Sequence, residues 1–286
     1  MRVGIKYGSR LGGVILSVIL VNYNNGTAIA SCLSTIFRYL SPRSGEYEVL
    51  VVDNSSTDNS RQLLHEGFPG LNLIENPKNV GFSRAVNQAF RRSRGKYILL
   101  LNPDMTVLPE SVNKMIGFMD DHPQVGLLLP KLLNPDGTLQ LSCRTFYDFP
   151  ILFFRKTPLG KMFPNHRVIR RHLMMDWNHE KAREVDWGLG ACMLLRRAAI
   201  SGNDLLDERF FLYFEDVDLC FRLKKEGWKV IYYPEAVMVH AHMRHSSRGW
   251  ISRAKWEHLK SLIKFFGKHR RFKEPVSWNN DSDLSC

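Results

Sequence analysis

Polar side chains that could bind a ligand follow a short apolar run in the first half of the chain. Residues 97–101 read Tyr-Ile-Leu-Leu-Leu, and Asn102-Pro103-Asp104 comes directly after them. An unbroken apolar run of this length favours a strand buried on both faces, and a proline ends it because proline cannot donate to a sheet ladder. Ligands bind at the carboxyl edge of open α/β sheets. We therefore expect Asp104 to hold a divalent metal ion on a nucleotide diphosphate; a simple turn is the alternative.

A second polar group follows the expected strand 48–52, where Asp53 and Asn54 stand at its end. A carboxylate at this point can accept hydrogen bonds from a nucleotide base or ribose, and the alternative is a cap for the next helix. Near the end of the chain, His240 also follows an apolar run, with His242 and His245 close by. Histidine at a strand end can ligate a metal, although a structural role is the more common one for a lone histidine.

A third group is acidic: Glu215-Asp216-Val217-Asp218 places three carboxylates in four residues, directly after the aromatic run 210–214. Acidic residues at a helix start are favoured by the helix dipole, and this is the structural interpretation. Three acids exceed what capping needs, however, and an apolar wall can raise the pKa of a carboxyl group. The cluster could therefore supply a general base for a hydroxyl group.

Strands and helices alternate through residues 14–104. Strands are expected at 14–21, 48–52, 71–75 and from 97, and helices after residues 27, 58 and 81. This alternation predicts an α/β fold with a mainly parallel sheet. The polar residues at the strand ends should then gather on one edge, where a nucleotide would bind; they are Asn22, Asp53, Asn76 and Asn102.

The second half is less regular. We expect a helix at 109–121, a strand at 125–129, a hairpin around 134–137 and an apolar and basic insertion over 144–183 that is a substrate lid or a membrane-facing loop. A strand at 185–195 contains Gly188 and Gly190, which suggests a close backbone approach. Next come a helix from 215 to Gly227, strands at 229–233 and 236–240, and an amphipathic tail helix over 250–267 with Trp256, Leu259, Ile263 and Phe266 on one face.

Bulk properties limit the functional classes. The formal net charge of +12 favours an anionic partner such as a phosphorylated substrate, an anionic lipid or a nucleic acid. The five cysteines are scattered without a CxxC pair, so we expect a reducing compartment and neither a disulfide framework nor a zinc cluster. No apolar run reaches transmembrane length. We divide the chain into a loose leader at 1–13, a domain at 14–245 with halves at 14–104 and 105–245, and a basic amphipathic tail at 246–286.

Taken in order, the motifs resemble those of the family 2 glycosyltransferases, inverting enzymes with the Rossmann-like GT-A fold, and within them the rhamnosyltransferase-like branch. The residues that carry the resemblance are Val21 to Asn24, Val51 to Asp58, Asn79 to Ser83, Leu100 to Asp104, Trp187 to Leu194 and Phe214 to Arg222. Asn102-Pro103-Asp104 stands where the family has Asp-x-Asp, so Asn102 replaces the first aspartate.

The resemblance implies a role for each matched residue. Asp216 would be the catalytic base, and Asp104 and His240 would hold Mg²⁺ or Mn²⁺. Donor contacts would come from Asn22, Asn24, Asp53, Asn54, Asn79, Gly81, Phe82, Asn102 and Asp104. Acceptor contacts would come from Trp187, Gly190, Ala191 and Glu215.

The implied function is inverting transfer of a sugar, with rhamnose as a candidate, from a nucleotide diphosphate donor to a saccharide or a polyprenyl-diphosphate-linked saccharide in cell-surface polysaccharide synthesis. The basic, apolar tail and insertion favour a peripheral position on the anionic inner face of the plasma membrane, and the alternative is a tail helix packed on the core. A sugar nucleotidyltransferase should carry a basic glycine-rich loop, whereas residues 22–26 contain no lysine or arginine. A non-catalytic binding protein would not need Glu215, Asp216 and Asp104 together.

Overall fold

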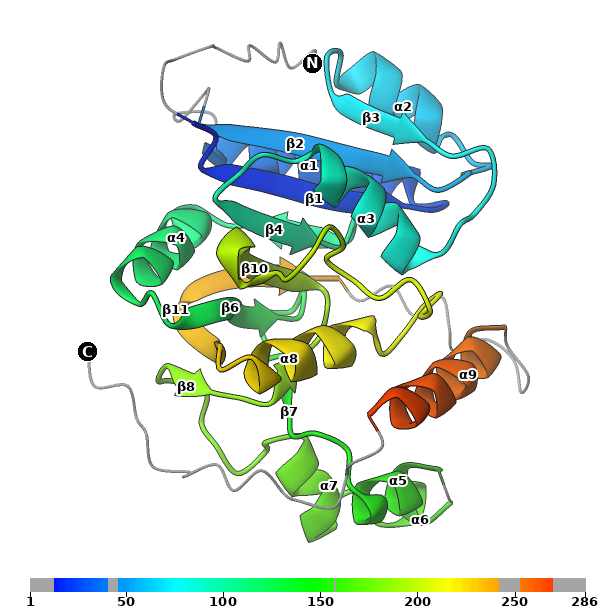
Figure 1. Cartoon of the computed structure of the whole chain (residues 1–286), viewed down its shortest axis with the longest axis vertical. Coiled ribbons are helices and arrows are strands. Elements are labelled where there is room, and N and C mark those ends of the chain that lie inside the picture. The colour runs from blue at the N-terminus through cyan, green and yellow to red at the C-terminus, as the bar shows by residue number, and fades with distance from the viewer. Residues whose placement is uncertain (1–12, 41–45, 157, 242–252, 270–286) are drawn as a thin grey trace.

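The computed structural model describes residues 13–40, 46–156, 158–241 and 253–269. Within these residues a nine-stranded sheet runs through the molecule in the order β3-β2-β1-β4-β10-β6-β11-β5, with β8 beside β11. Helices cover both faces of this sheet (Figure 1). The expected mixed, mainly parallel α/β fold is therefore confirmed.

The first half is the parallel part of the sheet. Its strands are β1 (Leu16–Asn22), β2 (Tyr47–Asp53), β3 (Asn72–Glu75) and β4 (Tyr97–Leu101), and its helices are α1 (Gly26–Leu40), α2 (Ser60–Gly67) and α3 (Phe82–Arg92). Every residue of β4 is buried, and the strand lies between β1 and β10. The apolar run that precedes Asn102 is thus a central strand, as its composition predicts.

Two hydrophobic clusters hold the layers together. Alternate residues of β1 face opposite sides, so that Val18 packs in the cluster with α1, α2 and α4 (Ser111–Asp121), whereas Ile19 packs in the cluster with α3, α8 (Glu215–Lys225) and α9 (Arg253–Lys268). This alternation is the period-two pattern of a strand buried on both faces.

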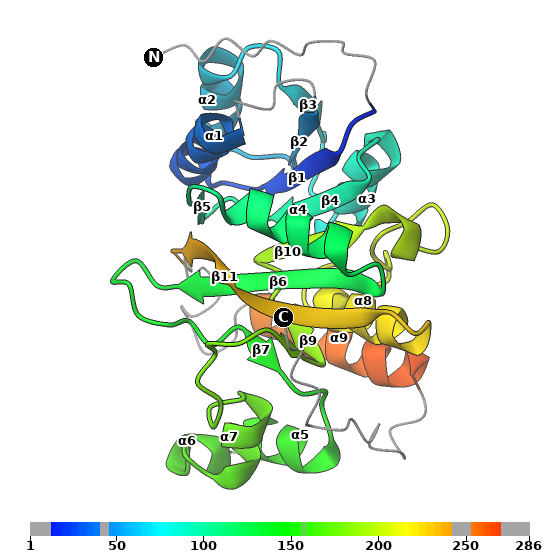
Figure 2. The same cartoon turned by 90° about the vertical axis from the view of Figure 1, so that its left-hand side faces the viewer.

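The second half contains strands that run in both directions. β6 (Val125–Leu133) and β11 (Lys229–His240) are parallel to each other, while β10 (Cys192–Arg196) and β5 (Met105–Val107) are antiparallel to their neighbours. Figure 2 shows β6 and β11 side by side along their length. The predicted hairpin is present as a turn, in which Asn134 N donates to Thr138 O at 2.8 Å.

Two predicted strand boundaries are wrong. The single strand expected at 185–195 is two strands in different sheets, β9 (Trp187–Gly188) and β10. β9 pairs with β7, whereas β10 pairs with β4 and β6, and the Gly190 N–H between them bonds the Asp216 side chain. The two strands expected at 229–233 and 236–240 are one strand, β11, with a register shift between Tyr233 and Val237. Pro234 has no N–H to donate, and a bulge accommodates it.

The insertion forms short helices at the end of the molecule opposite β3 (Figure 1). They are α5 (Phe149–Lys156), α6 (Leu159–Met162) and α7 (Arg167–His172), framed by β7 (Cys143–Arg144), which pairs with β9, and β8 (Arg183–Glu184). A short 3₁₀ turn, η2, follows β10 at Arg197–Ala199. No periodicity in the sequence indicated these helices.

The tail helix α9 packs on the core. Leu262 and Phe265 are buried, whereas Trp256 and Ile263 are 57% and 64% exposed. The packed alternative for the tail is therefore what the structure shows, and a stripe of apolar residues still faces outward. None of the helices in the described residues has the length and apolar character needed to cross a membrane. The leader at 1–12, His242 and His245, and the tail beyond 269 lie outside the described residues.

Candidate functional site

The strand ends of β1 and β2 form one buried polar network. Asn22 and Asp53 are opposite each other in the parallel register, and the Asn22 amide donates to Asp53 Oδ2 and to Ser56 Oγ, both at 3.0 Å. Asn24, at a φ of 55°, accepts from the Thr57 backbone N–H at 2.7 Å. The predicted gathering at one edge is therefore observed for Asn22 and Asp53. Asn76 N also donates to Asp53 O at 2.9 Å, and Asn102 follows Leu101, which lies opposite Leu20 of β1.

Asp53 is fully buried at the centre of this network. It accepts from Ser56 N at 3.0 Å and from Arg61 Nε at 2.8 Å. Burial opposes ionisation, but the hydrogen bonds from Ser56, Arg61 and Asn22 outweigh it and hold the pKa of the Asp53 carboxyl below its usual value. The helix α2 begins at Ser60, whose N–H is bonded by Asp58 rather than Asp53. Asp53 is thus a fixed carboxylate of the strand edge and not the cap of α2.

Asn54 shapes the next loop of the same edge. Its amide donates to Asn79 Oδ1 at 3.0 Å and to Gly81 O at 3.3 Å, and its oxygen accepts from Val80 N at 3.0 Å. Gly81 has a φ of 90°, and a Cβ there would lie 2.6 Å from the Phe211 ring. Only glycine suits both the backbone conformation and this contact.

Asp104 lies beside His240, as the sequence analysis predicts. His240 Nε2 is 3.3 Å from Asp104 Oδ1, and His240 Nδ1 is 2.7 Å from Gln140 Oε1. Because a neutral imidazole that donates from Nδ1 presents a lone pair at Nε2, Gln140 turns a second ligand atom towards the Asp104 carboxylate. Asp104 Oδ1 and His240 Nε2 could therefore bind the same divalent cation. In metal-binding histidines the ring nitrogen that does not bind the metal typically has a hydrogen-bond partner, as Nδ1 of His240 has in Gln140.

The possible metal site has few protein ligands. Within the described ranges no group of three or more histidine, cysteine, aspartate or glutamate residues could hold a metal ion. Mg²⁺ is commonly bound by one or two carboxylates together with substrate phosphates. The Asp104 and His240 pair therefore fits a metal that a nucleotide diphosphate would help to hold.

The acidic cluster at the start of α8 divides into different roles. Asp216 accepts from Gly190 N at 3.1 Å and from Val217 N at 2.8 Å. Glu215 is buried, and its Oε2 has no hydrogen-bond partner. The preceding residue, Phe214, occupies the N-cap, and no side chain caps the helix. Asp216 bonds the N–H of Val217 in the first helical turn, whereas Asp218 bonds Lys268 and His269, so capping does not account for all three acids.

Burial sets the protonation of the acidic pair. Burial raises the pKa of the Asp216 carboxyl, although the N–H groups of Val217 and Gly190 act in the opposite direction. Burial and the neighbouring Asp216 charge raise the pKa of the Glu215 carboxyl well above its usual value. Asp216 is thus the member of the pair that is better suited to carry a negative charge and to accept a proton.

A turn at 189–191 connects the two halves of the site. Ala191 O accepts from Asn102 N at 2.9 Å, and the adjacent Gly190 N–H donates to Asp216. A Cβ at Gly190 would lie 3.4 Å from Asp216 Cβ, so the close backbone approach expected there is observed. Trp187 and Ala191 are buried, and the Trp187 indole N–H donates to Thr145 O. An acceptor contact for these residues and for Glu215 stays a prediction.

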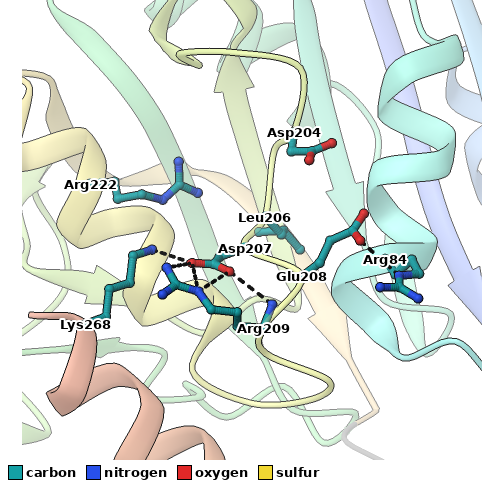
Figure 3. Close-up of a pocket in the computed structure, with 8 residues that line it drawn as sticks. All are labelled: Arg84, Asp204, Leu206, Asp207, Glu208, Arg209, Arg222 and Lys268. Atoms are coloured by element: carbon teal, nitrogen blue, oxygen red, sulfur yellow. Dashed lines mark hydrogen bonds and ion pairs between the residues drawn. The ribbon is translucent and has the colours of Figure 1, made fainter.

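A charged pocket of about 500 Å³ lies between α3, the loop before α8 and α9 (Figure 3). Asp207 forms ion pairs with Arg209 and Lys268, and Glu208 forms an ion pair with Arg84. The charged side chains that line the pocket therefore largely neutralise one another. Lys268 and His269 also reach the buried carboxylate of Asp218, each at 2.7 Å. The bonds of Lys268 to Asp207 and Asp218 therefore attach the end of the tail helix to the domain.

Sequence reasoning missed two residues of the site. Gln140 orients His240, and Phe211 closes on the loop at Gly81. Gln140 lies in a turn without hydrophobic periodicity, so no pattern signals its partner. The aromatic run 210–214 was visible, but its contact with the donor half depends on how the two halves pack.

The chain is similar to known proteins over most of its length. Residues 17–187 match the family model described as "Glycosyl transferase family 2". The chain is 27% identical over 283 residues to an N-acetylglucosaminyl-diphospho-decaprenol L-rhamnosyltransferase of Mycobacterium tuberculosis, covering 95% of this chain and 91% of that one. It is 25% identical over 262 residues to the rhamnosyltransferase WbbL of Escherichia coli, covering 88% and 93%.

Solved structures share the fold. The mannosyltransferase PcManGT from Pyrobaculum calidifontis in complex with GDP-Man and Mn²⁺ has a TM-score of 0.58 at 19% identity, over 91% of this chain and 65% of that one. TarS 1–349 of S. aureus in complex with UDP-GlcNAc also has a TM-score of 0.58 at 20% identity, over 88% and 67%. Both likenesses concern the fold alone.

Proposed function

Because the chain belongs to glycosyl transferase family 2, we propose that it is an inverting glycosyltransferase that moves a sugar from a nucleotide diphosphate donor to a saccharide or lipid-linked saccharide acceptor in cell-surface polysaccharide synthesis. The observation that carries this proposal is the turn at 189–191. In this turn Ala191 bonds Asn102, two residues before Asp104, and Gly190 bonds the proposed base Asp216. The turn therefore links the segment that carries Asp104, the expected ligand of a metal ion on the diphosphate, to Asp216, the expected base for the acceptor hydroxyl group.

The donor half would bind the nucleotide at the strand ends of β1 and β2 and at the loop 79–82. The network of Asn22, Asp53 and Asn54 holds this edge in one conformation before a ligand arrives. A preorganised edge lowers the ordering cost of binding.

Asp104 and His240 would hold Mg²⁺ or Mn²⁺, with Gln140 fixing the imidazole. When bound, such an ion would neutralise the charge that develops on the departing diphosphate. Binding of Mn²⁺ in the presence of a nucleoside diphosphate, followed by electron paramagnetic resonance, tests this assignment without any turnover. Asp104→Asn and His240→Ala should each weaken Mn²⁺ binding about tenfold to a hundredfold. Unchanged binding in both variants would remove the assignment.

Asp216 would accept the proton of the acceptor hydroxyl, whose oxygen then attacks the anomeric carbon on the face opposite the leaving diphosphate. The hydrogen bonds from Gly190 and Val217 fix the carboxylate for this step. A single displacement needs no covalent intermediate, so the anomeric configuration inverts. Positioning and charge stabilisation supply most of the rate enhancement in such a site.

The first donor sugar to test is rhamnose, because the relatives from Mycobacterium tuberculosis and Escherichia coli are named rhamnosyltransferases. The purified protein is incubated with a panel of nucleotide diphosphate sugars, with and without Mn²⁺ and an acceptor. Acceptor-dependent release of the nucleotide diphosphate from one donor supports transfer. Release of diphosphate from a nucleoside triphosphate and a sugar phosphate would indicate a nucleotidyltransferase instead.

The outward stripe of α9 supports a peripheral membrane position at the inner face of the plasma membrane. Trp256, Leu259 and Ile263 are exposed on a helix whose other face packs on the domain, and Lys260 and Lys264 lie on the same helix. An apolar stripe with basic residues around it suits the surface of an anionic bilayer.

Vesicle flotation tests the role of this stripe. Trp256→Ser with Ile263→Ser should reduce binding to vesicles that contain an anionic lipid, because both side chains are exposed and the packed face is unchanged. Tyr23→Ser, which removes another exposed aromatic side chain, is the matched control and should float like the unmodified protein. Equal flotation of all three proteins would exclude a membrane role for α9.

A further inference from the structure

Among the described residues, two neighbouring arginines of the insertion form no ion pair, and one of them, Arg144, lies near the proposed base Asp216. Arg144, at the end of β7, donates to Cys143 O at 2.6 Å, and Arg155, on α5, bonds His172 Nε2 at 3.0 Å. Neither guanidinium group forms an ion pair with any residue that the structure describes. The neighbouring arginines of the insertion differ, because Arg170 pairs with Asp176 and Arg171 pairs with Asp148.

Positive charge is concentrated around the two arginines. Burial, followed by the charges of Arg155 and Arg144, lowers the pKa of His172 to about 3. The imidazole is therefore neutral and accepts from Arg155 without adding a charge. Burial and the nearby Arg155 also lower the pKa of Arg144 to about 10. Two like charges so close to each other disfavour one another, and an anion would relieve this.

Arg144 lies near Asp216, and Arg155 lies on the helix α5, which exposes apolar side chains. Arg144 is opposite Trp187 in the register of β7 and β9, and Gly190, which bonds Asp216, follows three residues later. The positive charge of Arg144 acts on the Asp216 carboxyl. Large apolar side chains are exposed on α5, on α6 and directly after α6; Phe149 is 81%, Phe153 47%, Met162 66% and Phe163 52% exposed.

Asp216, the two arginines and the exposed apolar side chains of α5 together match an acceptor that has a sugar, an anionic group and an apolar tail. A sugar hydroxyl at Asp216 places the rest of that sugar near Arg144, and an anionic group on the sugar would then reach the two guanidinium groups. An apolar tail could continue over α5, which is the next element in the chain and lies with α6 at the outer end of the molecule (Figure 2). Arginine is the residue that best matches phosphate oxygens, through two parallel N–H donors.

We propose that Arg144 and Arg155 bind the diphosphate group of a lipid-linked acceptor, which makes the part of the insertion formed by β7 and α5 an acceptor site rather than part of the donor site. This inference rests on the proposed glycosyl transfer and names its acceptor class. The diphosphate of the donor is the other source of the same chemistry, and the experiment must separate the two.

The test compares two acceptors that share one sugar, a lipid diphosphate sugar and an O-alkyl glycoside of the same chain length. For each protein the ratio of kcat/KM for the diphosphate acceptor to kcat/KM for the alkyl glycoside is measured. Arg144→Gln and Arg155→Gln should each lower this ratio about tenfold to a hundredfold, the range expected for a hydrogen-bonded charge. Arg155→Lys should fall between Arg155→Gln and the unmodified protein, because it keeps the charge but not the two-pronged donor.

Arg167→Gln is the matched control, because Arg167 is exposed in the same insertion and has no ion pair among the described residues. It should keep the ratio of the unmodified protein. Equal losses on both acceptors in Arg144→Gln and Arg155→Gln would overturn the proposal in favour of a structural role. An increase in the donor KM without a change in the ratio would assign the arginines to the donor diphosphate. Absence of transfer to either acceptor by the unmodified protein would instead overturn the proposed function itself.

Discussion

Replacement of Asp216 by asparagine tests whether Asp216, rather than its neighbour Glu215, is the catalytic base. Asp216→Asn keeps the size of the side chain and removes its negative charge. Loss of a general base costs about 10² to 10⁴ in kcat, or about 3 to 5 kcal/mol at 1.36 kcal/mol per decade. Donor binding should survive, because the donor contacts are expected at the strand ends of β1, β2 and β4.

The same substitution also affects hydrogen bonds. The two Asp216 oxygens accept from Gly190 N and Val217 N, and an asparagine can accept only one of these bonds while its amide group faces the other N–H. The stability of Asp216→Asn should therefore fall by about 1 to 3 kcal/mol. Kinetic assays belong at a temperature well below the measured Tm of the variant.

Glu215→Gln is the matched comparison. Glu215 Oε2 has no partner to lose, and burial already favours the neutral form of this carboxyl group. We expect its loss in kcat to be at least tenfold smaller than that of Asp216→Asn. The assay follows acceptor-dependent release of the nucleotide diphosphate at saturating donor, together with the donor KM. Near-normal turnover of Asp216→Asn, or an equal loss in Glu215→Gln, would refute the assignment of the base.

Three further predictions concern stability and the donor loop. Gly81→Ala should raise the donor KM and destabilise the fold by about 1 to 2 kcal/mol, since alanine would need a φ of 90° and a Cβ 2.6 Å from the Phe211 ring; an unchanged Tm and KM would contradict this. Asp218→Asn should cost about 3 to 5 kcal/mol in urea unfolding, because it leaves Lys268 and its neighbouring cations without a buried carboxylate; a loss below about 1 kcal/mol would show that the ion pairs are not needed. Because the pKa of Glu215 is raised, the folded chain keeps a proton that the unfolded chain loses near pH 4.5. Stability therefore falls as the pH rises from there through the folded pKa. Glu215→Gln should lessen this fall in Tm, and parallel curves of Tm against pH for the two proteins would exclude Glu215 as its source.

The first half of the fold was predictable because each of its elements carries a local pattern. The run 97–101 is buried throughout in β4, and Ile29, Leu33 and Ile36 recur at helical spacing and are buried in α1. Patterns of this kind depend only on neighbouring residues. Parallel strands separated by helices then have few ways to assemble, so the meeting of Asn22 with Asp53 followed from the order of the elements.

The errors arose where distant segments decide the local structure. The segment 185–195 resembles one strand, but its first part pairs with β7 and its last part with β4 and β6, and Gly190 between them bonds Asp216. Pro234 signals a strand end, yet β11 continues through a bulge because β6 pairs with it on both sides of the proline. Neither outcome can be read from neighbouring residues alone.

The candidate site was predictable only in part. The proximity of His240 to Asp104 was implied by the resemblance to a family and not by spacing, because the two residues are far apart in the sequence. Gln140, Arg144 and Arg155 lie in irregular segments without periodicity, so their contacts depend on how the insertion packs.

The anomeric configuration of the product tests the central claim most directly. The unmodified protein is incubated with the donor that the panel identifies and with an acceptor, and the linkage of the transferred sugar is determined by NMR. A single displacement assisted by Asp216 predicts a linkage of configuration opposite to that of the donor. A linkage with the donor's configuration would contradict this account, because it would require a different reaction course at this site.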